Sequence, residues 1–260
     1  MMIKILLLLI FILLFIIGGN RGIVAMLSLI GNIGVILLSI VLIYWGINPI
    51  LVTLGLCILV SCITLFYQNG RNYKTISAFI SVMIVMLLLV LAVYKLGIYS
   101  DINGFDKIKQ NQDDMVGLSL NIDIDMVKLG ISVIIIGLIG SILDTAIAVS
   151  SAEYEVYVNN TSINKSELFI SGINIGKDIL GTTINTLFFA YFAEGLMLFI
   201  LMYNIDSSIL RILNSKIFFQ GFFSILFSFI ATILVIPITS YVTAYVLNNK
   251  QKFNKLISED

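Results

Sequence analysis

The chain has 260 residues, of which 59% are hydrophobic and 12% charged, and its 15 basic residues balance its 15 acidic ones. Soluble domains carry roughly 25% charged residues, so this composition excludes an ordinary soluble fold and predicts a protein of the lipid bilayer. The zero net charge gives no indication of a nucleic-acid partner. The chain has no histidine, which removes the commonest metal ligand and the commonest base at neutral pH.

Long apolar runs predict an all-α fold, a polytopic bundle of about seven transmembrane helices with short interfacial helices. We interpret residues 1–260 as a single transmembrane domain. The predicted spans are residues 3–17, 23–45, 50–67, 76–96, 129–150, 182–203 and 217–247. The Asn48-Pro49 pair predicts a break after the second span, and Pro237 predicts a kink or tilt in the last.

The first run has two interpretations. Lys4 precedes an apolar stretch that resembles a signal-peptide core, which would be cleaved. However, it ends at Gly18–Gly22 without a clear small-x-small cleavage site and leads directly into another apolar run. We therefore expect a retained helix.

Two polar segments interrupt the spans. Residues 97–128 form an acidic loop in which we expect a short helix or two at the membrane surface. Residues 168–181 form a glycine-rich amphipathic segment before the sixth span. Positive charges near span ends favour the cytoplasmic side. The residues that carry them are Arg21, Arg71, Lys74, Lys250, Lys252 and Lys255. The two faces carry almost equal numbers of basic residues, so the count alone decides little. Weighted over Lys107 and Lys109 of the acidic loop, these short basic sites predict a cytoplasmic C-terminus and an acidic loop that faces outward.

Asp144 is the clearest polar residue inside a predicted span. It belongs to a stripe of small and polar residues at three- and four-residue steps, which includes Ser141 and Thr145. An unpaired carboxylate in hydrocarbon costs several kcal/mol, so we expect Asp144 to face a neighbouring helix or a cavity. The alternative is that Asp144 caps or hydrogen-bonds a helix end near the interface.

A second polar stripe begins the sixth span. Asn174, Asp178, Thr182 and Asn185 lie along one side of a helix, and Gly172 and Gly176 form a small-xxx-small pair. We predict that this stripe meets the Asp144 stripe in a polar seam between spans five and six. The residues predicted for the seam are Asp144, Ser141, Thr145, Asn174, Lys177, Asp178, Thr182, Asn185 and Glu194.

Glu194 has its own alternatives, because helical phase places it roughly opposite Asn185. A charge at that depth indicates a functional site, but pairing with a cation on another span or a water-lined cleft would also explain it.

Catalytic motifs are not found. Gly176-Lys177 fails as a phosphate-binding loop, since three residues rather than four separate Gly176 from Gly172 and Asp178 replaces the required Ser or Thr. Cys57 and Cys62 lie on nearly opposite faces of one helix, which disfavours a disulfide and indicates two buried apolar thiols. We predict no enzyme activity, no catalytic residue, no cofactor and no metal. An enzymatic interpretation would require Asp144 and Asp178 to form a carboxylate pair.

Two motifs resemble a known family. Residues 137–152 (GLIGSILDTAIAVSSA) and 171–186 (SGINIGKDILGTTINT) are similar to the YibE/F-like membrane proteins of bacteria, and Arg21-Gly22 at the start of the second span fits the same pattern. The chain resembles the shorter, F-type member. The resemblance implies a multi-pass protein of the bacterial cell membrane, of a family often described as transporters, and an E-type partner or a homo-oligomer. Glu194 departs from the small or apolar residue expected there.

Two functions are therefore predicted. The first is a permease-like transport subunit whose polar seam forms the path. The second is an assembly or regulatory subunit in which the same seam packs helices and binds an E-type partner. Small residues alone do not distinguish the two.

Overall fold

The structure is a computed structural model, and it describes residues 2–99, 125–205, 210 and 216–254. The elements in chain order are α1 (Met2–Tyr44), α2 (Pro49–Cys62), the π-helix η1 (Ile63–Tyr67), α3 (Tyr73–Tyr99), α5 (Met126–Asn159), α6 (Lys165–Ile205), α8 (Lys216–Asn248) and α9 (Lys250–Phe253). The described residues contain no strand, which confirms the all-α fold. The predicted surface helices of the acidic loop fall largely on residues 100–124, outside the described part.

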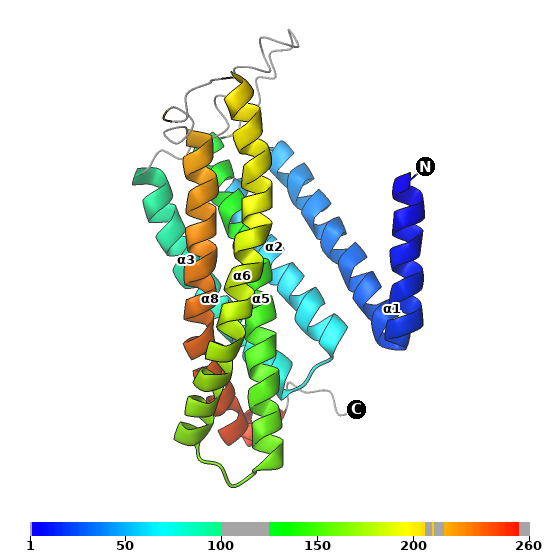
Figure 1. Cartoon of the computed structure of the whole chain (residues 1–260). Helices are drawn as coiled ribbons and strands as arrows, with labels where there is room; N and C mark the ends of the chain where they lie inside the picture. Colours follow the sequence, from blue (N-terminus) through cyan, green and yellow to red (C-terminus); the bar gives the residue numbers. More distant parts are fainter. Residues whose placement is uncertain (1, 100–124, 206–209, 211–215, 255–260) are drawn as a thin grey trace.

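A sharp bend divides α1. Gly19 has φ 52° and ψ −134°, a backbone conformation that residues with a Cβ rarely adopt. Figure 1 shows α1 running down to this bend and back up. Close to the bend, a Cβ on Gly22 would be 2.0 Å from the carbonyl oxygen of Leu14, so only glycine permits this approach. The bend falls where the sequence predicted a break, between residues 17 and 23.

Capping residues define the starts of α2 and α5. The Asn48 side chain accepts a hydrogen bond from the Ile50 N–H, and Pro49 occupies the first turn, where its missing N–H costs nothing. Asp125 caps α5 in the same way. The predicted turn at Asn48-Pro49 is confirmed.

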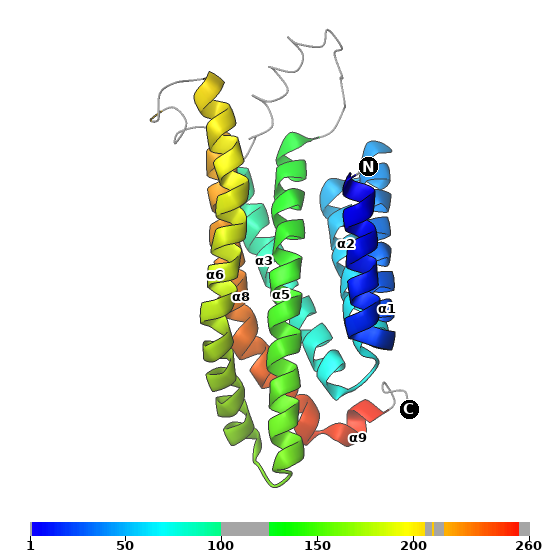
Figure 2. The same ribbon diagram turned by 45° about the vertical axis from the view of Figure 1, so that its right-hand side comes forward.

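Helix α5 is the centre of the bundle. It packs against α2, α3, α6 and α8, and its buried side chains recur every three or four residues. The α5 residues that form this stripe are Ile131, Ile134, Ile135, Leu138, Ile142, Ala146 and Val149. In both views α3, α5, α6 and α8 stand side by side, while α1 lies at the edge against α2 and η1 (Figure 1, Figure 2). The bundle therefore buries its core on one side of α2 and leaves most of α1 exposed.

Two helices extend beyond the predicted spans. Residues 165–205 form one continuous helix, so the amphipathic segment 168–181 and the predicted sixth span both belong to α6. Helix α5 continues to Asn159, nine residues beyond the predicted end of its span at residue 150. Both extensions pack against the bundle, and this packing stabilises helix where the local sequence is polar.

Five helices of the described residues are long and apolar enough to cross a membrane. These candidate spans are Lys4–Tyr44, Pro49–Tyr67, Tyr73–Gly97, Val127–Asn159 and Gly221–Asn248. The predicted count of seven is not confirmed, because α1 counts once despite its bend and α6, with Asn174, Lys177, Asp178 and Asn185, is not among the five. Pro237 lies inside the continuous helix α8.

Candidate functional site

The predicted seam residues on α5 divide into two groups. Ser141 and Thr145 are buried, and the Ser141 hydroxyl donates to the carbonyl oxygen of Leu138 in its own helix. Asp144 is exposed, and so is Gly140, where an added Cβ would meet nothing within 4 Å. The predicted α5 stripe is therefore not a single face, because Ser141 and Thr145 point into the core while Asp144 and Gly140 lie on the surface.

The polar residues of α6 face away from the core. Asn174, Lys177, Asp178, Thr182 and Asn185 are all exposed. Helical phase places Asn174 and Asn185 roughly opposite Gly172 and Gly176, which are buried against other helices. The α6 stripe therefore does not cover Asp144: Asp144 and the polar residues of α6 are exposed, whereas Ser141 and Thr145 are buried. The side chain of Glu194 lies outside the described residues.

Two contacts hold α6 against α5, one on each side of Asp144. The Tyr191 hydroxyl of α6 donates to the carbonyl oxygen of Gly137 at 3.4 Å and lies 2.8 Å from the Ser228 hydroxyl of α8. Asp144 comes two turns after Gly137, and Asn185 comes six residues before Tyr191 in the antiparallel helix. Because α-helices rise 1.5 Å per residue, Asp144 and Asn185 lie at similar heights along the bundle.

The second contact centres on Gly172. A Cβ there would be 2.5 Å from Glu153 Oε2 and 2.7 Å from Ser240 Oγ, and a Cβ on Gly176 would be 2.2 Å from a methyl carbon of Ile236. The Gly172/Gly176 pair thus forms the close helix contact that its spacing predicted, but with α8 and Glu153 rather than with the Asp144 face.

Glu153 is the residue that sequence reasoning missed. Its side chain is 0% exposed, and neither carboxylate oxygen has a hydrogen-bond partner among the described residues. The predicted fifth span ends at residue 150, so Glu153 lies three residues outside it. The signal that identifies it is helical phase, since Glu153 follows Val149 by four residues and so extends the buried stripe of α5.

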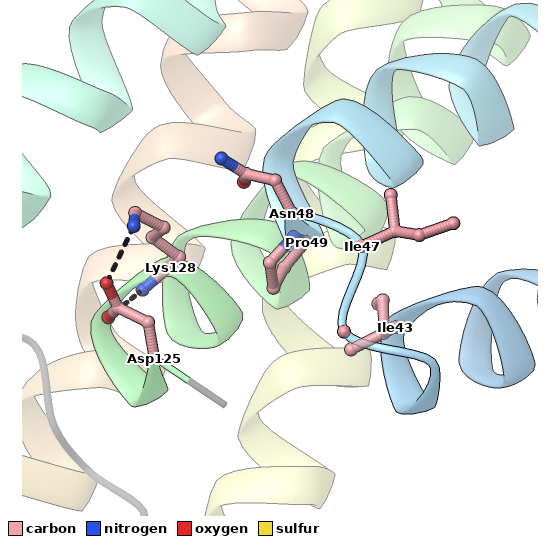
Figure 3. Close-up of a pocket in the computed structure, with 7 residues that line it drawn as sticks. Ile43, Ile47, Asn48, Pro49, Asp125 and Lys128 are labelled. Carbon is pink, nitrogen blue, oxygen red and sulfur yellow. Dashed lines mark hydrogen bonds and ion pairs between the residues drawn. The ribbon is translucent and has the colours of Figure 1, made fainter. Parts of the chain in front are cut away.

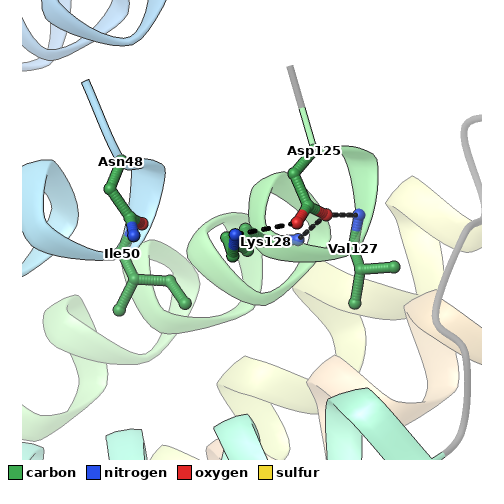
Figure 4. A network of polar contacts seen from close by, with 5 residues as sticks. All are labelled: Asn48, Ile50, Asp125, Val127 and Lys128. Atoms are coloured by element: carbon green, nitrogen blue, oxygen red, sulfur yellow. Dashed lines mark hydrogen bonds and ion pairs between the residues drawn. The ribbon is translucent and has the colours of Figure 1, made fainter. Parts of the chain in front are cut away.

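A small pocket lies at the opposite end of α5. It has a volume of about 220 Å³ and is lined by residues of the α1–α2 turn and by Asp125 and Lys128 (Figure 3). Asp125 accepts hydrogen bonds from the Val127 and Lys128 N–H groups at 3.1 Å each and forms a 3.0 Å ion pair with the Lys128 ammonium (Figure 4). The polar side chains of this pocket thus act as helix caps, Asn48 at α2 and Asp125 with Lys128 at α5, and this structural role accounts for them.

The hydrogen bond and ion pair from Lys128 hold the pKa of Asp125 below its ordinary value, and the Val127 N–H acts in the same direction. The Asp125 carboxylate that caps α5 is therefore charged at neutral pH.

Among the described residues, no group of three or more His, Cys, Asp or Glu side chains is placed to hold a metal ion. Asp144 and Asp178, the carboxylates that an enzymatic interpretation would require as a pair, are both exposed.

Comparison with protein families gives one match. The family model described as YibE/F-like protein matches residues 6–249, which is nearly the whole chain. Neither the curated proteins nor the solved structures include a match.

Proposed function

This chain belongs to the YibE/F-like family, and its long apolar helices indicate a membrane protein. We propose that it is a permease-like transport subunit with its path along α5 and α6. One observation carries the proposal: Asp144 and Asn185 lie uncovered at similar heights, between the Tyr191–Gly137 contact and the Gly172 contact. An ionisable or amide side chain facing lipid costs several kcal/mol. Water beside these faces would remove that cost.

Tyr191 fits the role of a constriction in such a path. Its hydroxyl bridges Gly137 of α5 and Ser228 of α8, and an added Cβ at Gly137 would be 3.4 Å from it. The absence of a side chain at Gly137 leaves room for the tyrosine to lie across α5. Its rotation would open the path beside Gly137, two helical turns from Asp144.

The proposal includes seven crossings, with α1 crossing twice and α6 once. The arm of α1 before Gly19 has about 17 residues, or roughly 25 Å at 1.5 Å per residue, which approaches the hydrocarbon thickness. We further propose that the end of the bundle with α9 faces the cytoplasm of a bacterial cell, because basic residues near span ends favour that side.

A second candidate function has its own supporting observation. The polar face of α6 is turned away from α5 and α8, so a second copy or a YibE-type partner would cover it as well as water would. In that case the protein is an assembly or regulatory subunit.

Thiol accessibility tests the proposal. In a variant with Cys57 and Cys62 replaced by alanine, single cysteines are introduced as Asp144→Cys, Asn185→Cys and Leu87→Cys, and each is treated in membranes with a charged, membrane-impermeant methanethiosulfonate. Leu87 is the control, because it is an exposed apolar residue of α3. The transport proposal predicts modification at residues 144 and 185 and none at 87.

The same variants distinguish the second function. Protection of residues 144 and 185, together with oxidative cross-linking of Asn185→Cys to a second copy or to a co-purified partner, would replace the transport proposal by the assembly subunit. Protection at both positions without cross-linking would contradict both functions.

A further inference from the structure

The buried carboxylate of Glu153 lies where three helices meet. Glu153 belongs to α5, Gly172 to α6 and Ser240 to α8, and the two side-chain oxygens nearest to Gly172 are Glu153 Oε2 and Ser240 Oγ. Glu153 and Ser240 are both 0% exposed, and neither has a hydrogen-bond partner among the described residues. A buried polar group without a partner costs free energy, and a buried charge costs much more. The site is therefore incomplete without something that interacts with these oxygens.

Most buried hydroxyls elsewhere in the described bundle have a hydrogen-bond partner, although Ser132 and Thr145 of α5 have none. Thr53, Ser61 and Ser81 each donate to the carbonyl oxygen four residues earlier in their own helix, the usual solution for a hydroxyl inside a helix. Ser240 and its α8 neighbours Thr239 and Thr243 are fully buried and have no partner in the described structure. The Ser240 oxygen thus remains free to bind a ligand beside the carboxylate.

No basic side chain described near this end of the bundle neutralises Glu153. The Lys165 ammonium lies over the rings of Tyr241 and Tyr245, at 4.5 and 4.9 Å from their centroids. The Lys250 ammonium lies 4.2 Å from the Tyr157 ring centroid and 5.2 Å from that of Tyr73.

The remaining titratable neighbours do not pair with Glu153 either. Glu155 and Glu167 are exposed, and the next residue, Tyr154, packs in an apolar cluster with Leu168 and Leu247. This cluster adjoins the carboxylate at the end of the bundle that carries α9.

We propose that Glu153 and Ser240, with the neighbouring hydroxyls of α8, form a binding site for a sodium ion. Carboxylate and hydroxyl oxygens are hard ligands, which suit an alkali or alkaline-earth cation rather than a soft metal. The single negative charge matches a monovalent ion, whereas a divalent ion in a buried site requires more carboxylates than one.

This site goes beyond the proposed function, because its binding of sodium does not depend on what passes along α5 and α6. Within a transport subunit it would couple the movement of α6 against α5 and α8 to a sodium gradient, since its ligands come from α5 and α8 and close around Gly172 of α6.

The test is the thermal unfolding of the purified full-length protein in detergent, titrated with NaCl at constant ionic strength against choline chloride. A ligand that binds only the folded state raises Tm by roughly 3–6 °C for each tenfold increase in its concentration above Kd. The prediction is that the wild type responds to sodium, that Glu153→Gln does not, and that Ser240→Ala responds at about tenfold higher sodium. Glu155→Gln, which removes an exposed carboxylate two residues away, serves as the matched control and should respond like the wild type.

Two outcomes would overturn the sodium site. An equal sodium response in wild type and Glu153→Gln would place the ion elsewhere. A Tm that rises on acidification in the wild type but not in Glu153→Gln, with no response to sodium, would show a proton site only.

The failures of the two proposals are distinguishable. If the wild type shows no Tm response to sodium but Asn185→Cys is modified by the charged reagent, the sodium site is contradicted and the transport path is retained. Should Glu153→Gln fail to fold, direct binding of ²²Na⁺ to wild type, Ser240→Ala and Glu155→Gln decides, and equal binding by all three would contradict the site.

Discussion

The backbone of Gly172 lies against Glu153 so closely that a single methyl group at residue 172 would be 2.5 Å from the carboxylate oxygen Oε2. This contact joins α6 to α5 at the buried acid, and Ser240 of α8 lies on the same side of the glycine. The missing side chain at residue 172 thus determines how closely three helices approach.

Gly172→Ala should therefore destabilise the protein despite the higher helix propensity of alanine. The added carbon must displace Glu153 and Ser240, and overpacking of this kind costs about 1–3 kcal/mol. Gly181→Ala in the same helix is the matched control, because nothing lies within 4 Å of its Cβ position, and it should stabilise by roughly 0.5–1 kcal/mol. Unfolding in mixed detergent micelles measures both, and equal effects of the two substitutions would contradict the close contact.

Gly22→Ala should loosen the bend of α1. The new Cβ would meet the backbone carbonyl of Leu14 at 2.0 Å, so the two arms of the helix must separate. Gly34→Ala, in the same helix with open space around it, should be neutral or slightly stabilising. Distances between spin labels on the two arms report the change. An unaltered distance in Gly22→Ala would show that the arms do not pack as described.

The cap of α5 gives a pH dependence with a definite sign. The pKa of Asp125 is lower in the folded than in the unfolded state, so its contribution to stability is complete above the unfolded value of about 4 and is lost as pH falls through the folded value. Asp125→Ala should lower stability by about 1 kcal/mol at neutral pH and have a smaller effect in acid. Thermal unfolding between pH 3 and 7 measures this difference, and a pH-independent effect would contradict the charged cap.

A polar contact links α1 to the π-helix. The Asn32 side-chain amide donates to Thr64 Oγ1 at 3.1 Å, while its own carbonyl oxygen is buried without a described partner. Thr64→Val should lower the free energy of unfolding by about 1 kcal/mol, because it leaves the Asn32 side-chain N–H unsatisfied. Asn32→Leu removes the N–H and the carbonyl oxygen of that side chain together and should cost less. A double-mutant cycle should give a coupling of about 0.6 kcal/mol. A coupling of zero would indicate that the contact does not form in the membrane.

The fold was largely predictable because helix breaks have local causes. Gly19 permits the bend of α1, and Pro49 with Asn48 starts α2, both at residues where the sequence indicated an interruption. The start of α6 at Lys165 was less evident, because its first half is polar and packs against α8, which lies far along the sequence.

The candidate site was less predictable, because composition does not reveal which face of a helix packs. Asp144 and Asn185 were expected to meet, but the packing of Gly172 and Gly176 against Glu153 and α8 turns the α6 polar face away. Glu153 was overlooked because its burial depends on side chains of α6 and α8 that are distant in the sequence.

The central claim is that water reaches the faces of α5 and α6 that carry Asp144 and Asn185, and its most direct test is spin-label accessibility in lipid nanodiscs. Nitroxides are attached at Asn185→Cys and at Leu87→Cys, and their relaxation by molecular oxygen, which enters lipid, is compared with that by a neutral nickel chelate, which stays in water. We predict that nickel relaxation exceeds oxygen relaxation at residue 185 and that the order is reversed at residue 87. Oxygen relaxation exceeding nickel relaxation at both residues would contradict the hydrated path.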